Sequence, residues 1–221
     1  MQLAYTDKNF YDLVFLQNIF PDTILRKING GFYNENFIPI IISTNTDLQD
    51  IILNYPSLIV KPAIESGGGE NVYLFKLSGN IMIDDTGNEL NLTFLETKLK
   101  KNYVLQKVLL QHRDLSKFNK TSINTIRVLT WLSPGSGNVE ILQCIFRVGA
   151  QGQFVDNSRS GGFAIGVGPQ GKLNKYATNK LGEHFTDVNG LSLLQHLEIP
   201  NFGEIKNKAK EIGSKYLQFR L

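Results

Sequence analysis

The chain has 221 residues, of which 42% are hydrophobic and 19% are charged, and its formal net charge is +3. This composition is that of a globular protein and excludes a disordered or low-complexity chain. The basic residues are scattered rather than gathered in one stripe, and no motif that reads nucleic acid is present, so we expect no nucleic-acid partner.

The N-terminus and the single cysteine indicate the compartment. The first ten residues, MQLAYTDKNF, contain neither a charged leader nor an apolar segment, and no apolar run reaches the ~18 residues that span a bilayer. Cys144 cannot form an internal disulfide, and the alternating run around it places Leu142, Cys144 and Phe146 on one buried face. We therefore expect a cytoplasmic protein without a membrane span.

The first half of the chain mixes helices and strands. Asp7 can cap a helix over residues 8–19, and a turn-rich stretch follows. The hydrophobic pattern then predicts, in order, a strand at 38–42, a helix near 46–54, strands at 57–61 and 72–76, a helix over 92–101 and a strand at 103–108.

The second half is mostly β. It predicts one hairpin from strands 125–132 and 139–148, a second hairpin from 161–167 and 172–177, and a closing helix over 202–217. This order of elements indicates an α+β fold with two lobes. We expect an N-terminal helical and linker portion at 1–56, a lobe at 57–115 and a mixed lobe at 116–221.

The segment IVKPAIESGGGENV at 59–72 ends a strand with Lys61 and continues into Gly67, Gly68 and Gly69. Glycine loses the most conformational freedom on ordering, so three in a row require a reason. The segment is either a tight hairpin or a loop whose bare N–H groups close over an anion. It is not a P-loop, because no lysine follows the glycines, and Val72 breaks the dinucleotide fingerprint.

Other polar residues interrupt apolar strands further along the chain. Gln106 and Lys107 lie in the strand at 103–108, and Arg127 and Arg147 lie in strands that otherwise have a core pattern. A charge within a core strand requires a bound anion or a partner carboxylate, and Glu140 is one candidate partner. The two lysines, taken singly, are equally well explained as surface residues. Zinc and serine-hydrolase motifs are absent.

Taken together, these segments resemble the ATP-grasp superfamily, and more closely its sugar-transfer-associated branch. The resemblance extends over most of the chain and is carried by TDKNF, IVKPAIESGGGENV, VLQKVLLQH, SINTIRVLT, FRVGAQGQFVDNSRSGGFAIGV and IPNFGEIKNKA. It implies two lobes with a nucleotide cleft between them, the second lobe being incomplete.

The resemblance also implies roles for individual residues. Lys61 and Lys107 would contact phosphate or the adenine edge of ATP, and Gly67, Gly68 and Gly69 would form a lid over the phosphates. The backbone from Gln106 to Leu109 would hydrogen-bond adenine, while Val108 and Leu109 pack on its face. Arg127, Arg147 and Asn157 would face the transferring phosphoryl group. The ribose contact stays open among Gln111, His112, Arg113 and Asp114, as does the role of His184.

Members of this superfamily also hold Mg²⁺ through carboxylates on strands that follow the helix matched here at 202–217, and the chain stops at Leu221. The metal ligands therefore stay unassigned, and the spacing of Asp156, Glu140 and Glu183 does not support them as substitutes. We expect weak nucleotide binding and poor ligation by this chain, and self-association through an exposed sheet edge.

The function implied by the resemblance is the activation of a small carboxylate as an acyl-phosphate for attack by an amine or a thiol, in the biosynthesis of cell-surface polysaccharide. One alternative is a nucleotide- or partner-binding module on the same scaffold that has lost catalysis. A second alternative is an unrelated α+β protein in which the glycines only form turns.

Overall fold

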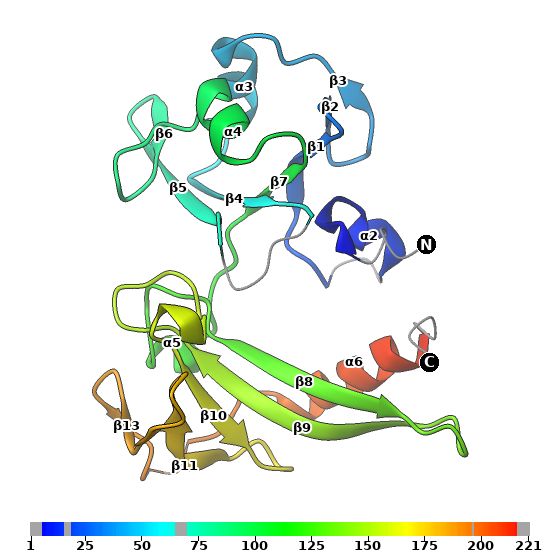
Figure 1. Cartoon of the computed structure of the whole chain (residues 1–221), viewed down its shortest axis with the longest axis vertical. Coiled ribbons are helices and arrows are strands. Elements are labelled where there is room, and N and C mark those ends of the chain that lie inside the picture. The colour runs from blue at the N-terminus through cyan, green and yellow to red at the C-terminus, as the bar shows by residue number, and fades with distance from the viewer. Residues whose placement is uncertain (1–5, 16–18, 65–69, 196, 216–221) are drawn as a thin grey trace. The chain divides into compact units, whose positions relative to one another are not determined.

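Figure 1 shows the computed structural model of the chain, which describes residues 6–15, 19–64, 70–195 and 197–215. The chain divides into two compact units, Met1–Leu109 and Leu110–Leu221. Each unit has its own cluster of buried apolar side chains. No described helix is long and apolar enough to cross a bilayer.

The first unit is a seven-stranded antiparallel sheet with short helices on both faces, and the strand order is β3-β2-β1-β7-β4-β5-β6. Its elements are η1 (Lys8–Phe10), α2 (Tyr11–Val14), β1 (Thr23–Ile28), β2 (Gly31–Tyr33), β3 (Pro39–Ile40), α3 (Asn45–Ile52), β4 (Ser57–Pro62), β5 (Tyr73–Ser78), β6 (Ile81–Ile83), α4 (Leu92–Lys98) and β7 (Tyr103–Lys107).

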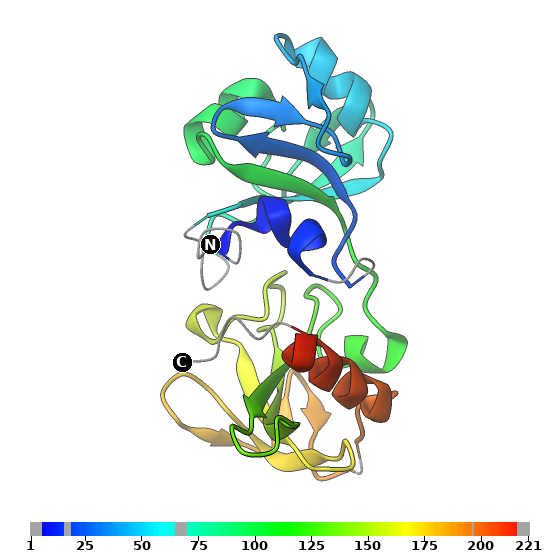
Figure 2. The same cartoon turned by 90° about the vertical axis from the view of Figure 1, so that its right-hand side faces the viewer.

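The core of the first unit lies between one face of this sheet and helices α3 and α4. Thr44 and Asp47 form a capping box that begins α3, so that Leu48 is turned toward the sheet and fully buried. Leu95 of α4 is buried in the same cluster, against Leu58 of β4 and other strand residues. Figure 2 shows these two helices on one side of the sheet and the N-terminal η1 and α2 on the other. The second face of the sheet therefore packs against the N-terminal segment instead of against α3 and α4.

The second unit is a five-stranded antiparallel sheet in the order β12-β11-β10-β9-β8, with α6 packed against β8 and β9. Figures 1 and 2 show α6 running along the β8–β9 hairpin. Its elements are α5 (Arg113–Ser116), β8 (Thr125–Leu132), β9 (Val139–Val148), η2 (Ser158–Ser160), β10 (Phe163–Val167), β11 (Leu173–Thr178), β12 (His184–Phe185), β13 (Asp187–Val188), β14 (Leu191–Ser192) and α6 (Phe202–Lys215).

The α+β class is confirmed, and β8 and β9 have the bounds that the sequence predicts. The helix expected over 8–19 is wrong, because η1 and α2 together end at Val14 and Phe15 is extended. Strands β1 and β2 occupy the stretch expected to be turns. Since β1 pairs with β7, the domain boundary expected after residue 56 runs through one sheet.

The prediction that Leu142 shares the buried face of β9 with Cys144 and Phe146 is also wrong. Cys144 and Phe146 are buried, but Leu142 is 58% exposed. The pairing of β8 with β9 shifts register between Leu129 and Thr130, which face Gln143 and Ile141, so Leu142 is an extra, bulged residue. A bulge reverses the alternation of side chains beyond it, and Leu142 therefore points away from the core.

The turn between β10 and β11 depends on Gly171, which has a φ of +92° and whose added Cβ would lie 2.8 Å from the Cβ of Phe202. Gly171→Ala should lower the free energy of unfolding by roughly 2–5 kcal/mol, because the backbone strain and the clash add together. Gly137, with φ +70° and open space around it, is the matched control. Gly137→Ala should cost only the strain, roughly 1–2 kcal/mol. Urea unfolding followed by fluorescence of Trp131 measures both losses, and equal losses would contradict the packing role of Gly171.

Candidate functional site

The face of the first sheet opposite α3 and α4 carries polar and cationic side chains. In the ladder, Lys61 of β4 lies opposite Val104 of β7, and Arg26 of β1 lies opposite Val104 from the other side. Gln106 follows two residues after Val104. Residues directly opposite one another point to the same face, as do residues two apart. Lys61, Arg26 and Gln106 therefore share the face that α3 and α4 do not cover.

The N-terminal segment η1 lies on this face, where it contacts β1 and β7. Its first residue, Lys8, is tied to the end of β4: its backbone N–H donates to the carbonyl of Ala63 at 2.9 Å, and its Nζ donates to the same oxygen at 3.4 Å. The buried Asp7 caps η1 by accepting from the N–H of Asn9 at 2.9 Å. Because Ala63 is two residues beyond Lys61, Lys8 and Lys61 are neighbours.

Arg26 fixes the N-terminal segment to the sheet. Its guanidinium is fully buried, donates to the carboxylate of Asp12 and the carbonyl of Asn9, and lies 4.1 Å from the ring centre of Phe37. A buried charge with this many partners is stabilised by them, and removing one partner would leave the charge uncompensated. Arg26 thus has a structural role: by bonding Asn9 and Asp12, it fixes the segment that carries Lys8.

Lys61 differs from Arg26 in having no counter-charge within the described part of the chain. Among the described residues, no hydrogen bond or ion pair involves its ammonium group. Burial, together with a smaller effect of the positive charge of Lys8, lowers the pKa of Lys61 to about 8. The pKa of Lys8 is also lowered by burial, although Asp7 opposes this. Two ammonium groups in a partly dry environment favour the binding of an anion between or beside them.

Gln106 contributes an unused acceptor on the same face. Its side chain is buried, and its Nε2 donates to Thr23 Oγ1 at 3.0 Å and to the carbonyl of Pro21 at 3.3 Å. Its Oε1 is buried without a partner in the described part of the chain. A buried acceptor left unsatisfied is costly, so a ligand that donates a hydrogen bond here would be stabilised.

The structure does not bring Lys107 together with Lys61. Lys107 lies opposite Leu58 and so points to the other face, where its Nζ pairs with Asp22 at 2.9 Å. The hydrogen bond that Lys107 donates to the Asp22 carboxylate raises the pKa of Lys107. The strand ends at Lys107, and within the described residues no backbone hydrogen bond joins Val108 or Leu109 to another residue. The predicted lid, Gly67 to Gly69, lies outside the described residues.

In the second unit, Arg127 and Arg147 share the face of the sheet that does not carry the core. Arg147 lies opposite Thr125, and Arg127 follows two residues after Thr125 on β8. Arg127 lies in a strand that also carries core residues, but its own side chain is exposed. Its guanidinium has no ion pair with any described residue. The alternation of β8 explains this, since Ile126 and Val128 occupy the core face.

Arg147 is partly buried and has a carboxylate partner. Its Nη2 lies 3.1 Å from Asp156 Oδ1 and donates to the backbone carbonyl of Asp156 at 3.3 Å. The Thr125 hydroxyl also donates to Asp156. The partner is therefore Asp156 rather than Glu140, which lies opposite Trp131 further along the hairpin.

Asn157 is buried beside this pair. Its carbonyl accepts from the N–H groups of Ser160 at 3.0 Å and Gly162 at 3.1 Å, which closes the turn that follows Asp156. Its predicted role at the phosphoryl group stays a prediction. His184, whose role the sequence leaves open, stacks on Tyr176 with ring centres 4.7 Å apart.

The described residues contain no group of three or more His, Cys, Asp or Glu side chains that could hold a metal ion. Asp156 is engaged by Arg147, and Glu183 accepts from Asn179 at 2.6 Å. Within the described residues, therefore, no ligands are assigned to magnesium, and no chemical step is assigned to a metal here.

Sequence reasoning missed Lys8 and Arg26. Lys8 stands directly after the capping residue Asp7, in a segment expected to form a longer helix. Arg26 lies in a stretch expected to be turns. A signal for Arg26 is the acid Asp12 within the N-terminal segment, but a contact over 14 residues between different elements is not visible in a local pattern.

Lys61→Met removes the charge and keeps most of the apolar stem. The folded-state pKa of Lys61 is lowered from 10.5 to about 8, so the unfolded chain binds more protons than the folded chain between these values. The penalty on folding is complete below pH 8 and disappears as the pH rises toward 10.5. Lys61→Met should therefore be more stable than the native chain at pH 7, by roughly 1–3 kcal/mol, and the difference should shrink by pH 10.

Urea unfolding at pH 7, 8.5 and 10 measures this difference. Lys76→Met is the control, because Lys76 is exposed on β5, and it should change stability little at any of these pH values. A Lys61→Met chain that is less stable than the native chain at pH 7, or a difference that is independent of pH, would contradict the burial of an uncompensated charge.

Comparison with known proteins identifies a family for this chain. The family model described as sugar-transfer-associated ATP-grasp matches residues 6–221. No curated protein and no solved structure matches the chain. The match includes η1, the strand that carries Lys61, the β7 strand and the β8–β9 hairpin. The chain therefore belongs to the sugar-transfer-associated ATP-grasp family.

Proposed function

We propose that the first unit binds the phosphates of ATP at Lys61, with Lys8 as a second cation. The observation that carries this proposal is the Lys61 ammonium group, which is partly buried, has a pKa lowered to about 8 and has no counter-charge among the described residues. Membership of the ATP-grasp family supports ATP as the anion. A bound triphosphate would supply a counter-charge to the Lys61 ammonium group and would accept the hydrogen bonds that water accepts in the unfolded chain.

The remaining nucleotide contacts follow the end of β7. The free backbone groups of Val108 and Leu109 would hydrogen-bond the adenine edge, and their side chains would pack on the base. The unpaired Oε1 of Gln106 adds a buried acceptor near the same strand end. Gly67, Gly68 and Gly69 would close over the phosphates, and Lys107 would have to exchange Asp22 for the nucleotide in order to contact it.

The proposed reaction is the ATP-dependent activation of a carboxylate. The carboxylate oxygen attacks the γ-phosphorus and ADP leaves, which gives an acyl-phosphate; an amine or thiol then displaces phosphate from the acyl carbon. Negative charge gathers on the transferring group, so cations aimed at it are the main catalytic device. Arg127 is the guanidinium best suited to this role, because it has no carboxylate partner among the described residues. Asp156 would hold Arg147 beside it, and Asn157 would also face the transferring group. The family usually supplies Mg²⁺ as a further neutralising charge.

The substrates proposed are a small carboxylate and a small amine or thiol. The association of the family with sugar transfer supports a role in cell-surface polysaccharide biosynthesis, on the cytoplasmic side where ATP is present. Self-association stays a proposal that rests on β8. This strand pairs only with β9 within the described sheet, and its Leu129 and Trp131 are exposed.

A module that binds nucleotide without catalysis is the second candidate. The observation that favours it is the ion pair between Arg147 and Asp156, which neutralises one of the two arginines expected to act on the phosphoryl group. The two candidates differ in whether an acyl-phosphate forms, and this can be measured directly.

Lys61→Ala should weaken ATP binding. A charge-assisted hydrogen bond to phosphate contributes ~1.5–3 kcal/mol, so the dissociation constant should rise roughly 10- to 150-fold while the chain stays folded. Isothermal titration calorimetry with ATP measures this change. The matched control is Lys76→Ala, which removes an exposed lysine from the neighbouring strand β5 and should leave the affinity within about twofold. Equal affinities for the Lys61 variant and the native chain would exclude Lys61 as a phosphate ligand.

Arg127→Ala should lower the rate of acyl-phosphate formation by about 10²–10³-fold with little change in ATP affinity, because the charge that it stabilises develops during transfer. Hydroxylamine traps acyl-phosphates as hydroxamates, so the assay contains the chain, ATP, Mg²⁺, hydroxylamine and a set of small carboxylic acids. Lys175→Ala, at an exposed residue of β11, is the control. Native chain that binds ATP but forms no hydroxamate with any acid would favour the non-catalytic module.

A further inference from the structure

One edge of strand β9 is only half paired. Strand β8 pairs with β9 from Val139 to Arg147, whereas β10 pairs with it only from Cys144 to Val148. Along residues 139–143, the edge that faces away from β8 has no partner strand among the described residues. An open strand edge presents N–H and C=O groups to any extended segment that fits beside it.

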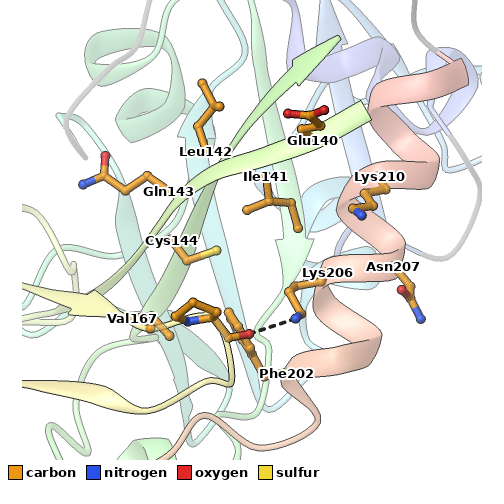
Figure 3. A pocket seen from close by; sticks show the side chains of 12 residues that line it. Glu140, Ile141, Leu142, Gln143, Cys144, Val167, Phe202, Lys206, Asn207 and Lys210 are labelled. Atoms are coloured by element: carbon orange, nitrogen blue, oxygen red, sulfur yellow. Dashed lines mark hydrogen bonds between the residues drawn. The ribbon is translucent and has the colours of Figure 1, made fainter. Parts of the chain in front are cut away.

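A pocket of about 620 Å³ lies where β10 would continue along β9. It is bounded by β9, by the turn at Gly168 and Pro169 that ends β10, and by α6. Figure 3 shows the side chains of Ile141, Cys144 and Phe202 around this space. The volume is within the range of ligand pockets, roughly 300–1,000 Å³. The bulge at Leu142 lies beside it, and bulges often mark the end of pairing at a binding site.

The α6 side of the pocket is positively charged. Lys206 donates from Nζ to the carbonyl of Pro169 at 2.8 Å, which fixes the turn against the helix. Lys210 lies one helical turn further, also lines the pocket, and has no hydrogen bond or ion pair with any described residue. Lys208, by contrast, does not line the pocket and pairs with Glu211 at 3.0 Å. Glu140 is the one acidic residue in the lining, so the two lysines leave an excess of positive charge.

We propose that this edge of β9 binds an extended acidic peptide segment of another protein, which adds a strand to the sheet. Backbone groups of the segment would pair with the open edge of β9 along 139–143. Every second side chain would then enter the apolar space around Ile141 and Phe202, and an acidic side chain would reach Lys210. Strand addition combines these two kinds of contact in one ligand.

The open backbone edge favours a peptide over a small anion. A small anion would need only the lysines, and it would leave both the edge of β9 and the apolar lining unused. The proposed site lies within the second unit and includes none of the residues assigned to ATP, so the two proposals can fail independently.

The probe is a fluorescein-labelled hexapeptide, Glu-Thr-Val-Thr-Glu-Thr, amidated at its C-terminus, whose valine and two flanking glutamates share one face of an extended strand. The readout is fluorescence anisotropy with the full 221-residue chain. We expect saturable binding. Lys210→Glu should weaken it at least fivefold, because an exposed ion pair contributes up to ~1 kcal/mol and the reversed charge adds repulsion. Lys208→Glu introduces the same charge on the same helix away from the pocket and should change the affinity by less than about twofold.

Two further measurements separate strand addition from simple charge attraction. Two further hexapeptides have the same sequence but carry N-methyl groups on alternate residues, one on the odd-numbered and the other on the even-numbered residues. Each keeps the charge of the parent peptide but cannot donate backbone hydrogen bonds from one of its two edges. We expect one of the two to lose binding. Peptide binding should also slow alkylation of Cys144, the single cysteine of the chain, which lines the pocket.

Absence of saturable binding would overturn the proposal. If both N-methylated peptides bind as tightly as the parent peptide, the site is instead a pocket for small anions. The same conclusion follows if free glutarate displaces the labelled peptide as effectively as the unlabelled parent peptide does. Equal weakening by Lys210→Glu and Lys208→Glu would mean that the peptide follows the charge of the helix and not this edge.

Discussion

The candidate site of the first unit depends on an ammonium group that is largely removed from water and has no counter-charge among the described residues. Lys61 lies on the sheet face opposite the core, beside Lys8, and the folded chain favours its neutral form more than water does. The neighbouring charges are arranged differently, since Arg26 is paired with Asp12 and Lys107 with Asp22. A largely buried ammonium group without a counter-charge costs stability, and a bound polyanion would compensate it.

The fold builds this site through the N-terminal segment. The core face of the sheet, with α3 and α4, supplies rigidity, and the other face is closed by η1 and α2, which Arg26 anchors through Asp12 and Asn9. Lys8 is thereby bonded to Ala63 at the end of β4, and Ala63 is two residues beyond Lys61. The same buried charge network thus determines both the position of the segment and the local potential at the site. Substitution of Arg26 should therefore lower both the free energy of unfolding and the affinity for an anion.

Much of the second unit could be predicted from the sequence, because β8 and β9 are long strands bounded by glycine and proline turns. Strand β1 could not be predicted. Its residues are buried on both faces, and Arg26 and Lys27 are adjacent within it, so neither alternation nor apolar continuity marks it as a strand. The helix expected over 8–19 failed because the segment packs as a short cap on the sheet, where tertiary contacts override helical spacing.

The candidate site was predictable only in part. Lys61 could be singled out because a lysine followed by a proline ends an apolar strand before glycines. The pairing of Arg147 with Asp156 depends on how the turn after β9 folds back, and the exposure of Leu142 depends on one bulged residue. Neither feature has a local sequence signal. Lys8 was overlooked for the same reason, since only the packing of η1 on the sheet makes it a neighbour of Lys61.

The most direct test is the pKa of Lys61 with and without nucleotide, measured by NMR on chain whose lysines carry ¹³C-methyl labels and assigned with Lys61→Arg. We expect a midpoint near pH 8 in the free chain. Saturation with ATP should move it upward, toward the ordinary lysine value near 10.4, because the phosphates supply the missing counter-charge. The same midpoint in the free and ATP-saturated chain, or a free-chain midpoint already at the ordinary value, would contradict the assignment of Lys61 to the phosphates.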